Sequence, residues 1–101
     1  MTDSVFVITK QGVYRHDIMG IYVVRGDAFR AAKKALKAEH DDYHTFNVTE
    51  ISLDTPAGKD EYGAIDEGKL LRIYGRDKEK MWWIRPQDID TRDREKGKHF
   101  I

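Results

Sequence analysis

The sequence predicts an α+β fold in which an antiparallel sheet of about five strands carries one helix on one face. Short runs rich in β-branched and aromatic residues recur along the chain, as in strands. One segment, Ala28–Glu39, has the three-to-four-residue apolar spacing of an amphipathic helix. The chain therefore reads as strand, strand, helix, strand and a final hairpin.

The first two predicted strands flank a turn. Val5–Thr9 is apolar on both faces, which is typical of a central strand. Gln11 and Gly12 supply turn residues, and Ile18–Val24 forms the second strand. Gly20 predicts a bulge there, or a close approach of another backbone.

The helix follows Asp27, which is placed to cap its first turn. Basic residues between Arg30 and Lys37 occupy the solvent face of the helix. The opposite stripe is made by Ala28, Phe29, Ala32, Ala35 and Leu36.

Tyr43–Leu53 is the third predicted strand, and a change of apolar parity near Thr49 predicts a bulge or twist. A polar loop, Asp54–Gly68, leads to a hairpin made of Leu70–Tyr74 and Lys80–Ile84. Strand directions give the order 2-1-3, and we expect the hairpin to extend the sheet beyond the third strand.

Residues 1–86 are predicted to form a single domain. Residues 87–101 alternate acid and base with little apolar content, which predicts a poorly ordered tail. Ile89, or Phe100 and Ile101, are the side chains that could hold it down.

The amino-acid composition argues against several classes of function. The 101 residues carry 18 Lys+Arg and 18 Asp+Glu, so net charge does not favour nucleic acid or an anionic membrane. With no cysteine, the chain lacks disulfides and thiolate metal sites. We read no signal peptide and no membrane-spanning run in the sequence, and therefore expect a soluble cytoplasmic protein.

The predicted topology brings several histidines and acids to one end of the fold: His16, Asp17, His40, Asp41, Asp42, Tyr43 and His44. Two chemistries remain open there. One is a metal site, and the other is acid–base work by a pair such as His16 with Asp42. Against both, His40 suits a helix C-terminus, the two aspartates suit a turn, and His16 suits a hairpin tip. We predict no cofactor, no metal and no catalytic residue.

Two surfaces are candidates for interaction. Trp82 and Trp83 must face opposite sides of the sheet. We expect one in the core and Trp83 on the second face with Arg72 and Tyr74, where it would bind a protein or stack on bases unless the loop or tail covers it. The second surface is the apolar edge strand Ile18–Val24, including Tyr22, unless the later hairpin covers it. We predict a homodimer that uses either this edge or the Tyr74/Trp83 face.

The runs VFVITKQGVYRHDIMGIY and DDYHTFNVTEISLDTP, with a short Ala-rich helix between them, resemble short, functionally unassigned proteins of actinobacterial phages and related bacteria. The resemblance covers mainly residues 5–56. It implies a phage-encoded accessory protein that acts in the cytoplasm of a host cell. It transfers no active residue.

The functional prediction is a small non-enzymatic interaction module that binds a host protein or a second copy of itself. The alternative is a small-ligand or metal-binding protein, including a weak hydrolase, that uses His16, His40, Asp42 and His44. A third class, nucleic-acid binding through the basic helix face, is disfavoured by the balanced charge.

Overall fold

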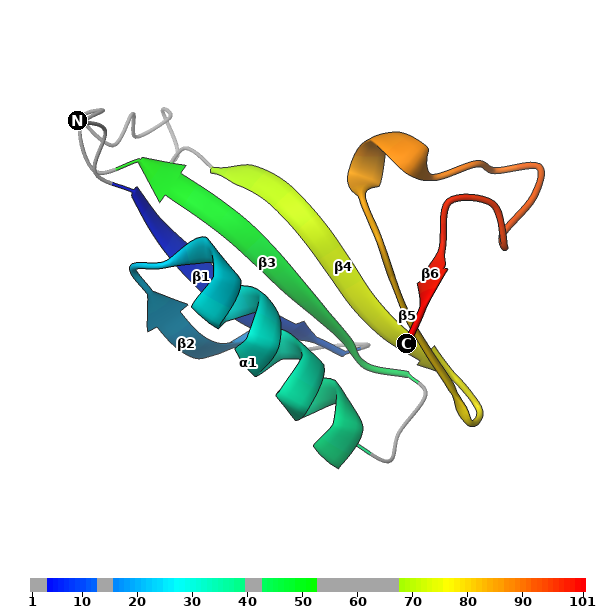
Figure 1. Cartoon of the computed structure of the whole chain (residues 1–101), viewed down its shortest axis with the longest axis horizontal. Helices are drawn as coiled ribbons and strands as arrows, with labels where there is room; N and C mark the ends of the chain where they lie inside the picture. Colours follow the sequence, from blue (N-terminus) through cyan, green and yellow to red (C-terminus); the bar gives the residue numbers. More distant parts are fainter. Residues whose placement is uncertain (1–3, 13–15, 40–42, 53–67) are drawn as a thin grey trace.

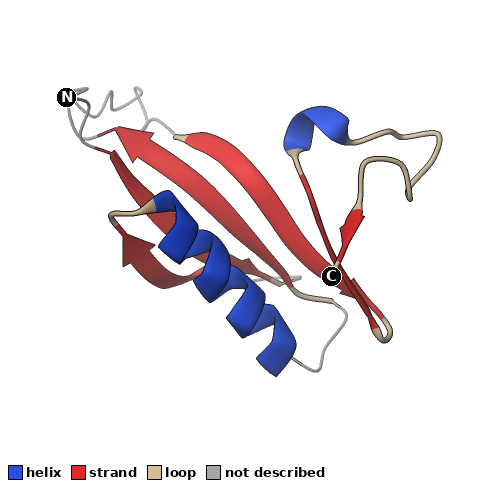
Figure 2. Cartoon of the chain, in the orientation of Figure 1, coloured by secondary structure: helices blue, strands red, loops and turns tan. Residues whose placement is uncertain are grey.

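The computed structural model describes residues 4–12, 16–39, 43–52 and 68–101. Within these ranges the chain forms a six-stranded sheet, one α-helix and a short 3-10 helix (Figures 1 and 2). The elements are β1 (Ser4–Gln11), β2 (His16–Tyr22), α1 (Arg25–Ala38), β3 (Thr45–Ser52), β4 (Lys69–Asp77), β5 (Lys80–Ile84), η1 (Pro86–Asp88) and β6 (His99–Phe100).

The sheet is open, with the strand order β2-β1-β3-β4-β5-β6. Every neighbouring pair runs antiparallel. This confirms the predicted α+β class, the 2-1-3 order and the addition of the β4–β5 hairpin beyond β3. Strands β2 and β6 are the two edges.

Two register shifts bend the sheet. One lies between Val48 and Thr49 in the β3–β4 pair, where the sequence predicts a bulge, and it leaves Leu71 as the extra residue. The other lies between Ile8 and Thr9 and leaves Met19 extra on β2, next to Gly20. A bulge sharpens the local twist and changes which way its residues point.

The hydrophobic core lies between α1 and one face of the sheet (Figure 1). Ala28, Ala32 and Leu36 of the predicted helical stripe are fully buried. Small residues on this stripe let the helix axis approach the strands closely. The sheet contributes Phe6, Ile8, Phe46, Val48 and Tyr74.

The helix starts earlier than predicted. It begins at Arg25, and the preceding residue, Val24, makes no capping hydrogen bond with its apolar side chain. Asp27 therefore lies in the first turn of the helix, where it pairs with Arg30. At the other end, Nη2 of Arg76 on β4 donates to the Leu36 carbonyl at 2.8 Å. This bond satisfies one of the carbonyls that a helix C-terminus leaves without an internal donor.

Residues expected to form a poorly ordered tail instead build η1 and β6. The Ile101 amide donates to the Met81 carbonyl at 2.9 Å, which extends the pairing of β6 with β5. The Lys98 ammonium lies 4.5 Å from the centre of the Trp82 ring and 3.0 Å from an Asp77 carboxylate oxygen. Aromatic and charged contacts thus fix a segment with few aliphatic side chains.

Candidate functional site

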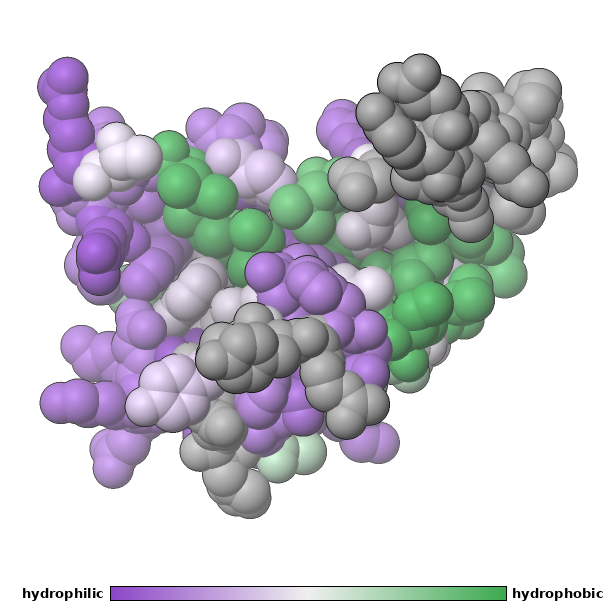
Figure 3. All heavy atoms as spheres, turned by 180° about the vertical axis from the view of Figure 1, so that it is seen from behind, coloured by the Kyte–Doolittle hydropathy of each residue, from purple (hydrophilic) through white to green (hydrophobic). Residues whose placement is uncertain are grey.

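The edge strand β2 is the most apolar exposed part of the described chain. Five hydrophobic side chains on β2 and the following connection are at least half exposed: Ile18, Met19, Ile21, Val23 and Val24. Ile18 and Ile21 pair with Thr9 and Val7 of β1, so they project from the face opposite α1. From behind, Figure 3 shows hydrophobic side chains at this edge, at the right of the view. Tyr22, also predicted to interact, is half-buried against the core.

The side chains of Arg72, Tyr74 and Trp83 do not form the exposed surface that the sequence predicts. The three side chains do gather on one face, as their parity predicts, but it is the face that α1 covers. Tyr74 is only 2% exposed and belongs to the core. The sequence left the choice of face open because both faces of the central strands are apolar.

Arg72 is the centre of the resulting stack. Its guanidinium carbon lies 3.9 Å from the ring centre of Phe29 on α1 and 3.7 Å from that of Trp83 on β5. On the far side of Trp83, the His99 ring stacks at 4.0 Å with an interplanar angle of 12°. Planar groups from α1, β4, β5 and β6 therefore form one column.

Tyr74 completes the contacts of Arg72. Nη1 of Arg72 donates to the Tyr74 hydroxyl oxygen at 3.1 Å. Burial raises the pKa of the Tyr74 phenol above its usual 10.0, and the hydrogen bond and charge of Arg72 partly oppose that rise. The phenol is therefore neutral at physiological pH.

The ends of β1, β2 and β3 next to the predicted histidine and aspartate cluster lie at one end of the sheet. Gln11, at the end of β1, has His16 as its partner on β2 and Thr45 on β3. The two outer strands are separated by β1, which places their backbones about 10 Å apart. The strand ends therefore meet at one end of the sheet, but not at one point.

Only part of the predicted ligand set can be placed. His16 and Asp17 are exposed, and His44 is half-buried with Nδ1 3.8 Å from a Glu39 carboxylate oxygen. His40 and Asp42 lie outside the described residues. Among the residues that are described, no three His, Asp or Glu side chains are grouped as metal ligands would be.

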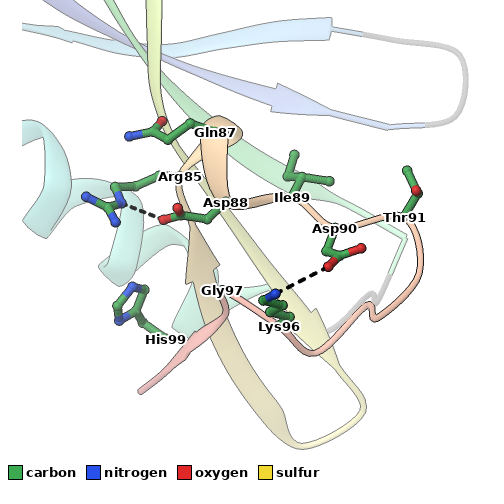
Figure 4. A pocket seen from close by; sticks show the side chains of 9 residues that line it. All are labelled: Arg85, Gln87, Asp88, Ile89, Asp90, Thr91, Lys96, Gly97 and His99. Atoms are coloured by element: carbon green, nitrogen blue, oxygen red, sulfur yellow. Dashed lines mark hydrogen bonds and ion pairs between the residues drawn. The ribbon is translucent and has the colours of Figure 1, made fainter.

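A hollow of about 600 Å³ lies between η1 and the C-terminal segment (Figure 4). Four charged side chains that line this hollow already form ion pairs with each other. Nε of Arg85 lies 2.7 Å from an Asp88 carboxylate oxygen, and the Lys96 ammonium lies 3.7 Å from one of Asp90. A ligand would have to compete with these internal ion pairs, so this hollow is the weaker candidate.

Sequence reasoning missed the contributions of Phe29 and His99 to the Arg72 stack. The sequence indicates only that Arg72, Tyr74 and Trp83 occupy alternating strand positions on the same side of the sheet. It indicates a common face but not the elements that pack on that face.

Comparisons with protein-family models, with curated proteins and with solved structures found no match to this chain. Within the described part of the chain, no helix is long and apolar enough to cross a membrane.

Proposed function

We propose that this chain is a non-enzymatic protein-interaction module that associates through the β2 edge, with a second copy of itself as the partner. The observation that carries the proposal is the exposure of Ile18, Met19 and Ile21, at 69%, 50% and 62%. An open edge offers unpaired amides and carbonyls to another strand, and apolar side chains beside it add burial.

A second copy fits this edge electrostatically. The ionisable side chains of β2, His16 and Asp17, stand at its start, and the rest of the strand is uncharged. When two β2 strands pair antiparallel across a two-fold axis, the charged end of each copy lies opposite the uncharged end of the other. The formal net charge of zero leaves little long-range repulsion between copies.

The resemblance to phage proteins supports a second class of partner at the same edge, a host protein that adds a strand. Strand addition relies on backbone hydrogen bonds, so one edge can serve both partners. A host partner would compete with dimerisation.

Light scattering at micromolar concentration tests the proposal. We expect a mass near twice 11.8 kDa for the wild type. Ile21→Lys places an ammonium in the interface and should give a monomer. Ile89→Lys is the matched control, because Ile89 is 53% exposed and lies far along the chain from β2. A wild-type mass near 11.8 kDa, or equal loss of the dimer in both variants, would contradict the proposal.

A further inference from the structure

A small hollow lies where the start of α1 meets the start of β4. It has a volume of about 180 Å³. Four of the residues that line it are cationic, Arg25, Lys69, Arg72 and Arg85, and Phe29 and Leu71 add apolar surface. Four cations around one hollow are notable in a chain whose formal net charge is zero.

Arg72 is held in a fixed orientation within this hollow. The Arg72 guanidinium carbon lies close to the ring centres of both Phe29 (3.9 Å) and Trp83 (3.7 Å), so these two rings restrict its movement. One N–H group donates to Tyr74. No carboxylate among the described residues pairs with Arg72, and Arg72 lines the hollow. A guanidinium that is held between aromatic rings and has no carboxylate partner is preorganised to bind a carboxylate or phosphate.

The other cations are only partly neutralised. Nη2 of Arg25 lies 3.8 Å from a Glu50 carboxylate oxygen, longer than a hydrogen bond, and Arg85 pairs with Asp88. Within the described residues, Lys69 has no ion-pair partner. Among the residues that the structure describes, four cations therefore line the hollow beside two carboxylates, an excess of two positive charges. Low dielectric walls strengthen the field of such an excess.

We propose that this hollow is a binding site for the phosphate group of a small phosphomonoester. A phosphomonoester carries about −1.5 to −2 charges at neutral pH, which matches the excess in the hollow better than a monocarboxylate does. The volume corresponds to about six water molecules of roughly 30 Å³ each, below the range of drug-sized ligands. Such a volume fits a phosphate and a short organic group in contact with Phe29 and Leu71.

The site is independent of the β2 edge, so a monomeric protein would bind the phosphate equally well. A titration followed by NMR tests it, with the Nε–Hε signal of the Arg72 guanidinium as the readout. The probes are inorganic phosphate and glycerol 3-phosphate, with neutral glycerol as the blank. We expect saturable shifts with both phosphates in the millimolar range and none with glycerol. Tighter binding of glycerol 3-phosphate would show that the apolar wall contributes.

Three variants localise the site. Arg72→Gln should weaken binding about tenfold or more, since it removes charge-assisted hydrogen bonds. Lys69→Gln, at an exposed position, should weaken it severalfold while leaving thermal unfolding unchanged. Arg94→Gln removes one positive charge from an exposed position outside the hollow and should bind as the wild type does. Absence of a saturable shift, or an equal response of Lys69→Gln and Arg94→Gln, would overturn the assignment.

Discussion

The two edges of the sheet end in opposite ways. Strand β6 spans two residues, and beside it Lys98 joins Trp82, Asp77 and Glu95. Strand β2 spans seven residues and is uncharged from Ile18 onward. Short length and a nearby lysine are common means by which proteins prevent an edge from pairing with another chain. The β6 edge has both, and the β2 edge has neither.

The two ends of the sheet are also stabilised by different interactions. The strands under α1 are held by aliphatic and aromatic burial against a helix of small residues. The β5–β6 end is held by planar and cationic side chains that pack on each other, including Trp83, Arg72 and His99. Substitutions at the β5–β6 end should therefore lower the free energy of unfolding, whereas substitutions at the β2 edge should change the association between copies of the protein.

The largest expected effect comes from Trp83→Ala. The substitution removes the ring between Arg72 and His99 and opens a space above Tyr74. We expect the free energy of unfolding to fall by no more than about 3–5 kcal/mol, the range for a fully buried aromatic residue, because Trp83 is only partly buried. Urea denaturation of the two proteins measures it. Trp83→Phe keeps a ring in the column and should recover part of the loss. A loss below 1 kcal/mol would show that the column contributes little.

The next effect concerns Gly75, which lies opposite Trp82 in the β4–β5 pair. A Cβ atom there would come within 2.4 Å of the Trp82 ring, which packs directly over the glycine. Gly75→Ala should therefore cost about 1–3 kcal/mol through displacement of the ring. Thermal unfolding measures the change.

Gly26→Ala is the matched control for Gly75→Ala. Gly26 lies in α1, and the nearest atom to an added Cβ is the end of the flexible Arg30 side chain at 3.4 Å. Because Gly26 is the second residue of α1, alanine should stabilise the protein by at most about 0.5–1 kcal/mol, the range for the middle of a helix. Opposite signs at the two glycines would confirm that Trp82 fixes the β4–β5 hairpin. A loss at both would contradict that role.

The strands and their order could be predicted from the sequence because local patterns and connection lengths carry that information. The apolar run in β1, the alternation around Thr49 and the hairpin spacing all appear in the structure. The order 2-1-3 follows from the strand directions together with the apolar residues on both faces of β1, which place it in the centre. Strand β6 escaped prediction because its two residues have no periodicity, and aromatic and cationic contacts hold the segment in place.

The candidate sites could be predicted only in part. The alternation of side chains along the strands predicts that Arg72, Tyr74 and Trp83 share one face of the sheet, but not that the helix covers this face. The hollow at Arg25 and Lys69 was missed because its cations come from separate elements that meet only in three dimensions. The β2 edge was anticipated because a strand at the end of the predicted order exposes its side chains.

A smaller effect is expected from Tyr74→Phe. Loss of the bond from Arg72 should cost about 1 kcal/mol near neutral pH. The pKa of Tyr74 is raised in the folded state, so the folded protein holds this proton more tightly than the unfolded chain does. The stability that it contributes is complete below pH 10.0 and is lost as pH rises through the folded pKa.

The difference between wild type and Tyr74→Phe should therefore shrink above pH 10.0. Urea midpoints measured across this range for both proteins test the sign. Because the other tyrosines and lysines titrate in both proteins, their contributions cancel in the comparison. A difference that grows with pH would mean that the phenolate is favoured by folding, against the effect of burial.

The smallest effect on the monomer is expected at the β2 edge. Ile18 is 69% exposed, so Ile18→Thr removes little buried surface and should change monomer stability by no more than about 0.5 kcal/mol. Its effect should appear instead in the dependence of unfolding on protein concentration. Association that occurs only between folded chains raises the apparent stability as concentration rises. Wild-type urea midpoints should therefore increase between low and high micromolar protein, and the increase should be reduced or absent in Ile18→Thr. The same increase in both proteins would mean that the copies associate elsewhere, and the contrast between the two edges would then lose its functional meaning.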